Sequence, residues 1–165
     1  MKVLYTGGMK SGKSRLAEAK TLSLSNDARP YYLATSEALD EEMAARIERH
    51  KEQRADRFES IEAALALYDT ISHLEGTVLV ECLSIWINNM LHYGRREADI
   101  MDELRKILDL EQNIVFVINE VGCGIIPDIA LAREFIDISG RAGQIVAAAC
   151  DEVYFCSVGL GLRMK

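Results

Sequence analysis

Short runs of apolar residues alternate along the chain with longer stretches in which apolar residues recur at helical spacing. The short runs predict strands at Val3–Thr6, Tyr31–Thr35, Thr77–Val80, Ile114–Ile118 and Val153–Ser157. Two of them, Thr77–Val80 and Ile114–Ile118, are apolar nearly throughout, as expected of central parallel strands that are buried on both faces.

The longer stretches have the spacing of helices with one apolar face. We expect helices over Ser11–Leu24, Asp40–Arg54, Ile61–Leu74, Leu83–His92, Asp99–Leu110 and Asp128–Cys150, and a short hairpin at Val158–Gly161. Strands that alternate with helices are typical of an α/β fold with a mostly parallel central sheet flanked by helices. The length of 165 residues fits one domain over residues 1–165.

Composition narrows the class of partner. A net charge of −7 and a pI near 5.0 argue against a nucleic-acid-binding surface, which would need many cations to replace phosphate counterions. The chain contains no apolar run of membrane-spanning length, and its first residues do not read as a signal peptide. The four cysteines (Cys82, Cys123, Cys150, Cys156) form no CxxC pair, so we expect reduced thiols and a cytoplasmic protein.

A complete phosphate-binding motif follows the first predicted strand. It has the spacing Gly-x4-Gly-Lys-Ser and comprises Gly7, Gly8, Met9, Lys10, Ser11, Gly12, Lys13 and Ser14. Glycines let backbone amides close around phosphate oxygens, and the next helix turns its positive end toward the same anion. Lys13 can reach the terminal phosphates and Ser14 can ligate Mg²⁺. Because the motif lies between a predicted strand and a predicted helix, a chance match is the weaker interpretation, and the predicted fold is a RecA-like P-loop NTPase.

Such a loop needs an acid at the end of a neighbouring strand to organise the metal ion. Glu81 follows Thr77–Val80, and Glu120 follows Ile114–Asn119. Either carboxylate could instead cap the next segment. The sequence does not rank the two acids, so we expect Ser14 and one of them, Glu81 or Glu120, to hold the metal ion.

One histidine lies in a locally basic segment of this acidic protein. Arg46, His50 and Arg54 are four residues apart, which places them on one face of a helix. Neighbouring cations disfavour imidazolium, so His50 would tend toward the neutral form that can act as a nucleophile. The alternative interpretation is a surface histidine on a solvated helix, which the spacing alone slightly favours.

With these segments identified, the chain resembles the bifunctional adenosylcobinamide kinase/adenosylcobinamide-phosphate guanylyltransferase family of cobalamin biosynthesis. The resemblance covers nearly the whole length. Its most specific parts are the blocks Asp40–Ile47 and Asn119–Pro127. The other matching segments are the phosphate loop, Tyr32–Ser36, Val80–Leu83, Leu131–Arg133, Gly140-Arg141 and Ala148–Val153.

The resemblance implies two reactions: phosphorylation of adenosylcobinamide by a nucleoside triphosphate, and transfer of GMP from GTP to adenosylcobinamide phosphate through a GMP-histidine intermediate. His50 occupies the position of that histidine, which reverses the preference from spacing. The implied cofactors are GTP, ATP and Mg²⁺, and the implied assembly is a homotrimer. Nucleotide contacts are implied at the phosphate loop and at Ala34, Thr35, Ser36, Lys51, Glu52, Gln53, Arg54, Glu62 and Glu81.

Some positions depart from the family pattern. Phe58 stands where a Trp is usual, Gly143 where an Asn is frequent, and the segment between Leu91 and Asn113 is short. Two other functions therefore stay open from the sequence. One is a monofunctional small-molecule kinase, against which the absence of an Arg-rich lid weighs mildly, and the other is a nucleotide-binding module without catalysis.

Overall fold

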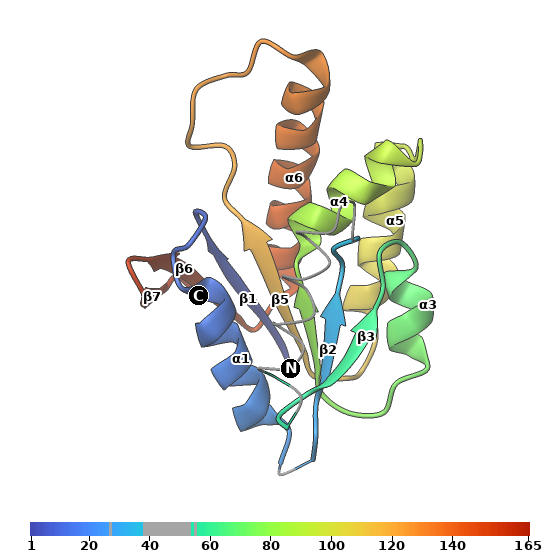
Figure 1. Cartoon of the computed structure of the whole chain (residues 1–165), viewed down its shortest axis with the longest axis vertical. Helices are drawn as coiled ribbons and strands as arrows, with labels where there is room; N and C mark the ends of the chain where they lie inside the picture. Colours follow the sequence, from blue (N-terminus) through green and yellow to red (C-terminus); the bar gives the residue numbers. More distant parts are fainter. Residues whose placement is uncertain (27, 38–53, 55) are drawn as a thin grey trace.

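A seven-stranded sheet forms the centre of the computed structural model, which describes residues 1–26, 28–37, 54 and 56–165 (Figure 1). The strand order is β3-β2-β4-β5-β1-β6-β7, and only the β6–β7 pair is antiparallel. The strands are β1 (Lys2–Gly7), β2 (Tyr31–Ala34), β3 (Glu59–Glu62), β4 (Val78–Glu81), β5 (Ile114–Asn119), β6 (Glu152–Ser157) and β7 (Leu160–Arg163). Among the described residues, helices connect β1 to β2, β3 to β4, β4 to β5 and β5 to β6, as parallel pairing requires.

The helices divide between the two faces of the sheet. They are α1 (Lys13–Leu24), α3 (Leu67–Ser72), α4 (Leu83–His92), α5 (Glu97–Leu108) and α6 (Ala130–Ala149). Helix α1 packs on one face through Ala17, in a cluster with Val3 and Tyr5. The other four pack on the opposite face, in a cluster that includes Leu4 and Phe116. Successive β1 side chains therefore enter different cores, because side chains alternate along a strand.

The predicted α/β architecture is confirmed, with one wrong boundary. The helix expected over Ile61–Leu74 is a strand at its start, because β3 pairs in parallel with β2 and places Ile61 opposite Leu33. The helix itself, α3, begins only at Leu67. Of the helix expected over Asp40–Arg54, all but Arg54 lies outside the described residues. No helix in the described part of the chain is long and apolar enough to cross a membrane.

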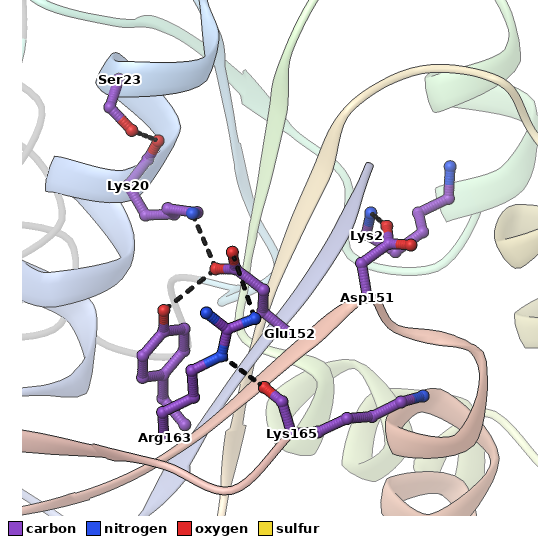
Figure 2. Close-up of polar contacts among 8 residues, drawn as sticks. Lys2, Lys20, Ser23, Asp151, Glu152, Arg163 and Lys165 are labelled. Carbon is purple, nitrogen blue, oxygen red and sulfur yellow. Dashed lines mark hydrogen bonds and ion pairs between the residues drawn. The ribbon is translucent and has the colours of Figure 1, made fainter.

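A group of polar contacts joins α1 to the C-terminal hairpin (Figure 2). The Glu152 carboxylate of β6 lies 2.7 Å from the Lys20 ammonium of α1 and 3.7 Å from the Arg163 guanidinium of β7. It also accepts a hydrogen bond of 3.0 Å from the Tyr154 hydroxyl. The Lys20 contact contributes most to lowering the pKa of Glu152 below its usual value. These contacts hold the hairpin against the helix that carries the phosphate loop at its N-terminus.

Candidate nucleotide site

Candidate residues from five strands lie together at the carboxyl edge of the sheet. Ala34 at the end of β2 pairs with Glu62 on one side and with Glu81 on the other. Gly7 at the end of β1 pairs with Asn119 of β5. In open α/β sheets ligands bind outside the carboxyl ends of the strands. Residues that are far apart in sequence therefore meet at the edge where the phosphate loop begins.

Two glycines of the phosphate loop occupy positions where a side chain would not fit. Gly7 has φ of +151°, and a Cβ there would collide with the backbone carbonyl oxygen of Cys156. Gly12 has φ of +92°, in the region that favours glycine, and a Cβ there would lie 2.8 Å from the Gly159 Cα. The loop can therefore keep this path only with glycine at both positions.

The β6–β7 turn supports the phosphate loop. The sequence did not predict this contact. The Gly159 N–H donates a hydrogen bond of 2.8 Å to the Ser11 carbonyl oxygen, and the Arg15 guanidinium donates one of 3.2 Å to the Gly159 carbonyl. The sequence predicted a hairpin at Val158–Gly161, but no local pattern indicates its packing against Gly12. One signal was available: β6 was expected to be a parallel strand, so its end should lie at the same edge as Gly7.

Lys13 is held inside the loop rather than in solvent. It is only 6% exposed, and its ammonium group donates a hydrogen bond of 3.0 Å to the Gly8 carbonyl oxygen. Backbone amides around the loop and the N-terminus of α1 add positive potential at the same place. The loop thus presents a pre-positioned cation and several donors to a polyphosphate.

Glu81, not Glu120, contacts the loop serine. The Ser14 hydroxyl donates a hydrogen bond of 2.8 Å to Glu81 Oε1. Burial raises the pKa of Glu81 to about 7, while the Ser14 hydrogen bond and the Lys13 charge oppose that rise. Glu120 instead accepts a hydrogen bond of 2.5 Å from the Gly122 N–H, so its carboxylate folds over its own turn.

The Ser14–Glu81 pair fits a divalent metal ion. The second carboxylate oxygen, Glu81 Oε2, is buried and has no hydrogen-bond partner among the described residues. A hydroxyl and a carboxylate are hard oxygen ligands, and Mg²⁺ usually takes one or two protein oxygens together with substrate phosphates.

Thr35 is tied by hydrogen bonds to the segment that carries Glu81. It is fully buried, and its hydroxyl donates a hydrogen bond of 2.9 Å to the Cys82 carbonyl and accepts one of 2.8 Å from the Cys82 N–H. The Asn89 amide donates a hydrogen bond of 2.7 Å to the Thr35 carbonyl. These bonds fix the segment that carries Glu81, and the nucleotide contact expected of Thr35 stays a prediction.

Arg54 is the described member of the predicted basic face. Its guanidinium lies 3.6 Å from the centre of the Tyr32 ring, as in a cation–π contact, and it is 8% exposed. Its positive charge also opposes the rise in the Glu81 pKa. Phe58 is buried and meets Tyr32 edge-on at 5.8 Å, so the aromatic character of that position is kept. His50, Lys51, Glu52 and Gln53 lie outside the described residues.

Comparison with solved structures supports the fold. The flagellar accessory protein FlaH of Methanocaldococcus jannaschii superposes with a TM-score of 0.55 at 12% identity, over 99% of this chain and 77% of FlaH. A second solved structure, described as an ATPase domain, gives 0.52 at 12% identity, over 93% of this chain and 68% of that domain. At this identity the likeness concerns the arrangement of strands and helices alone.

Sequence comparison identifies the family. The family model described as cobinamide kinase / cobinamide phosphate guanyltransferase matches residues 3–164. Two curated relatives are each called bifunctional adenosylcobalamin biosynthesis protein CobU: one from Escherichia coli K12 at 37% identity and one from Salmonella typhimurium LT2 at 39%. Each alignment covers 100% of both chains. The chain therefore belongs to the cobinamide kinase / cobinamide phosphate guanyltransferase family.

Proposed function

We propose that the protein phosphorylates the aminopropanol hydroxyl of adenosylcobinamide with a nucleoside triphosphate and then transfers GMP from GTP onto that phosphate. The products of the second reaction are adenosylcobinamide-GDP and pyrophosphate. The observation that carries the proposal is the match of residues 3–164 to a family described by both activities. The geometry of the phosphate loop supports it independently.

In the phosphorylation step the substrate hydroxyl oxygen bonds to the γ-phosphorus. The bond from that phosphorus to the β–γ bridging oxygen breaks, a nucleoside diphosphate leaves, and the hydroxyl proton passes to solvent. Catalysis of this kind consists mostly of positioning and charge stabilisation. Lys13 and the loop amides between Gly7 and Ser14 would hold the phosphates, and the Lys13 charge would stabilise the leaving oxygens.

Ser14 and Glu81 would hold Mg²⁺. The bound ion would supply positive charge to the phosphate oxygens and orient them. The Ser14–Glu81 hydrogen bond of 2.8 Å keeps both oxygens together beforehand, and Thr35 holds the chain at Glu81 through Cys82. The Glu81 carboxyl group would lose its proton when the cation binds, because a nearby positive charge favours the ionised form.

In the guanylyl step His50 would act as the nucleophile. An imidazole nitrogen would bond to the α-phosphorus of GTP while pyrophosphate leaves. A phosphate oxygen of adenosylcobinamide phosphate would then bond to the same phosphorus, the N–P bond would break, and free His50 would be restored. Such a covalent intermediate divides one difficult displacement into two easier ones. The support for this role is the position of His50 in the family pattern beside Arg46 and Arg54.

The remaining parts of the proposal concern nucleotides, assembly and compartment. GTP would serve the guanylyl step, and ATP or GTP would serve the phosphorylation. Ala34, Ser36, Glu62 and Arg54 would border the nucleotide, together with Lys51, Glu52 and Gln53. The protein would work as a cytoplasmic homotrimer, with reduced thiols at its four cysteines. Exposed apolar residues of β7, such as Leu160 and Leu162, are compatible with burial against another subunit.

Labelled GTP tests the histidine and the second activity together. The protein is incubated with GTP labelled on its α-phosphate, denatured, and examined for protein-bound label that acid removes, as expected of a phosphoramidate. We expect label on the wild-type chain and on His73→Ala, a control histidine at the end of α3. We expect none on His50→Ala.

The same variants separate the proposed enzyme from a simple kinase. His50→Ala should still phosphorylate adenosylcobinamide but should not exchange pyrophosphate into GTP. Undiminished label on His50→Ala would disprove the role of His50. A wild-type chain that phosphorylates the corrinoid but takes up no label would be a monofunctional kinase.

A further inference from the structure

A hollow of about 370 Å³ lies between α6 and the carboxyl ends of β1 and β5. Leu4, which lines it, belongs to the core on the face opposite α1, and Figure 1 shows α6 running along β5 and beyond its end. Ile118 and Ile136 give apolar walls, whereas Thr6, Asn119 and Glu120 give polar ones. An apolar pocket with a few polar groups is the usual form of a small-molecule site.

Helix α6 leaves this space open. Ser139, Gly140, Gly143 and Ala147 line the hollow, and their spacing of three and four residues places them on one face of the helix. A Cβ at Gly140 would meet no atom within 4 Å, and one at Gly143 would meet only Ile118 Cδ1, at 3.9 Å. Each glycine inside a helix costs about 1 kcal/mol relative to alanine. Packing with the described residues does not require these glycines, so their effect is to keep the hollow empty of side chains.

Ser139 lines the hollow, and its buried hydroxyl is an unused polar group. The residue is 3% exposed, and its hydroxyl has no hydrogen-bond partner among the described residues. A buried polar group without a partner costs about 1–3 kcal/mol. A serine inside a helix commonly avoids that cost by bonding to the carbonyl four residues earlier, and Ser139 does not. A bound molecule with an amide or hydroxyl group would satisfy it.

The hollow adjoins the phosphate loop from the side of α6. Thr6, which lines it, directly precedes Gly7, and the Glu120 N–H donates a hydrogen bond of 2.9 Å to the Gly7 carbonyl. A molecule that fills the hollow and extends past Thr6 therefore reaches the loop that holds the transferable phosphate. A kinase needs its substrate hydroxyl at that position.

We infer that the hollow holds the amide-linked aminopropanol arm of the corrinoid, while the ring stays outside. This inference rests on the proposed function. The arm is narrow and carries one secondary amide, one methyl group and the reactive hydroxyl, whereas the ring is too wide for the hollow. Ser139 would bond to the amide, Ile118 and Ile136 would contact the methylene and methyl groups, and the hydroxyl would point past Glu120 toward the loop.

Filling the hollow from α6 tests the inference. Gly143→Ala and Gly143→Leu add groups of increasing size, and Ala148→Leu adds a comparable side chain on the exposed side of the same helix. Two corrinoids are compared: adenosylcobinamide, and a corrinoid that ends in a primary amide where the arm would begin. We expect Gly143→Leu to raise KM for adenosylcobinamide by about tenfold or more. Relative to its effect on the corrinoid without the arm, the substitution should weaken the binding of adenosylcobinamide by a similar factor. Ala148→Leu should match the wild type.

The dissociation constant of GTP separates a local effect from a folding defect, and it should stay within about twofold in every variant. If Gly143→Leu fails to fold, the graded pair Gly143→Ala and Ser139→Ala gives the same comparison with smaller changes. Equal loss of both corrinoids, or wild-type KM in a folded Gly143→Leu protein, would overturn the placement of the arm and leave the proposed function standing. A wild-type chain that phosphorylates no corrinoid would overturn both.

Discussion

The phosphate loop and the hollow under α6 adjoin each other at Thr6 and Gly7, yet they are built in opposite ways. In the loop, Gly12 touches Gly159, the Lys13 ammonium bonds to Gly8, and the Ser14 hydroxyl bonds to Glu81. In the hollow, a Cβ at Gly140 would meet no atom within 4 Å and one at Gly143 would meet only Ile118, and the Ser139 hydroxyl has no partner in the described part of the chain. Contacts within the chain hold the loop in its conformation, whereas the hollow is an unfilled space with room for a ligand.

The difference has a physical origin in the two ligands. A triphosphate is bound through backbone amides, so the loop backbone must be held in one path before the ligand arrives. An organic arm is bound through shape and a few hydrogen bonds, so a wall of small residues suffices. Substitutions in the two regions should therefore have different consequences for the free protein.

The largest effect is expected at Gly12. Gly12→Ala should lower the free energy of unfolding by about 3 kcal/mol, because a Cβ there meets the Gly159 backbone as well as an unfavourable φ. Gly94→Ala is the matched control, since Gly94 has φ of +73° but no atom within 4 Å of a Cβ, and it should cost about 1 kcal/mol. Urea unfolding measures both. Equal losses in the two variants would show that the hairpin does not constrain the loop.

A smaller, pH-dependent effect is expected at Glu81. Its pKa of about 7 in the folded chain lies above the ordinary 4.5, so the folded state binds the proton more tightly than the unfolded state does. The free energy of unfolding of the metal-free protein should therefore fall by about 2.5 kcal/mol as pH rises from about 5 to about 8, through the folded pKa, and then level off. Glu81→Gln should lack this fall, and unfolding at pH 5 and pH 8 with a chelator present measures it. The same fall in Glu81→Gln would assign it to another group.

The smallest effects on stability are expected when either of two equally buried serines is replaced by alanine. Ser84 and Ser139 are each 3% exposed, but the Ser84 hydroxyl accepts a hydrogen bond of 2.8 Å from the Asn119 N–H. Ser84→Ala leaves that N–H without a partner and should cost about 1 kcal/mol, whereas Ser139→Ala removes a hydroxyl that has none and should be neutral or slightly stabilising. Thermal unfolding of the ligand-free protein compares them. A loss at Ser139 as large as that at Ser84 would contradict the open character of the hollow.

The strands and helices were largely predictable because their signals are local. Continuous apolar runs correctly indicated β4 and β5, and the glycine and lysine spacing correctly located the phosphate loop before α1. The strand β3 was not predictable in the same way. Ile61 and the apolar residues after it have helical spacing, but pairing with β2 decides the conformation of Glu59–Glu62. A short edge segment takes its structure from its neighbour more than from its own sequence.

The candidate site was predictable in its residue types and less so in its arrangement. Two acids were equivalent in sequence because each follows a strand, and only the folded chain shows Glu81 on Ser14 and Glu120 on Gly122. Thr35 lies at the expected edge of the sheet, and only the folded chain shows that its hydroxyl exchanges hydrogen bonds with Cys82. The role of His50 stays a prediction, because that residue lies outside the described part of the chain.

The sequence by itself determined the family, the phosphate loop and the alternation of strands and helices, because each depends on residues close together in the chain. Tertiary structure alone decided which acid faces the loop, that the Gly159 turn supports it, and that Ser139, Gly140 and Gly143 border a hollow beside Thr6. These facts depend on which strand ends become neighbours. That order is set by the packing of the whole sheet and has no local signal in the sequence.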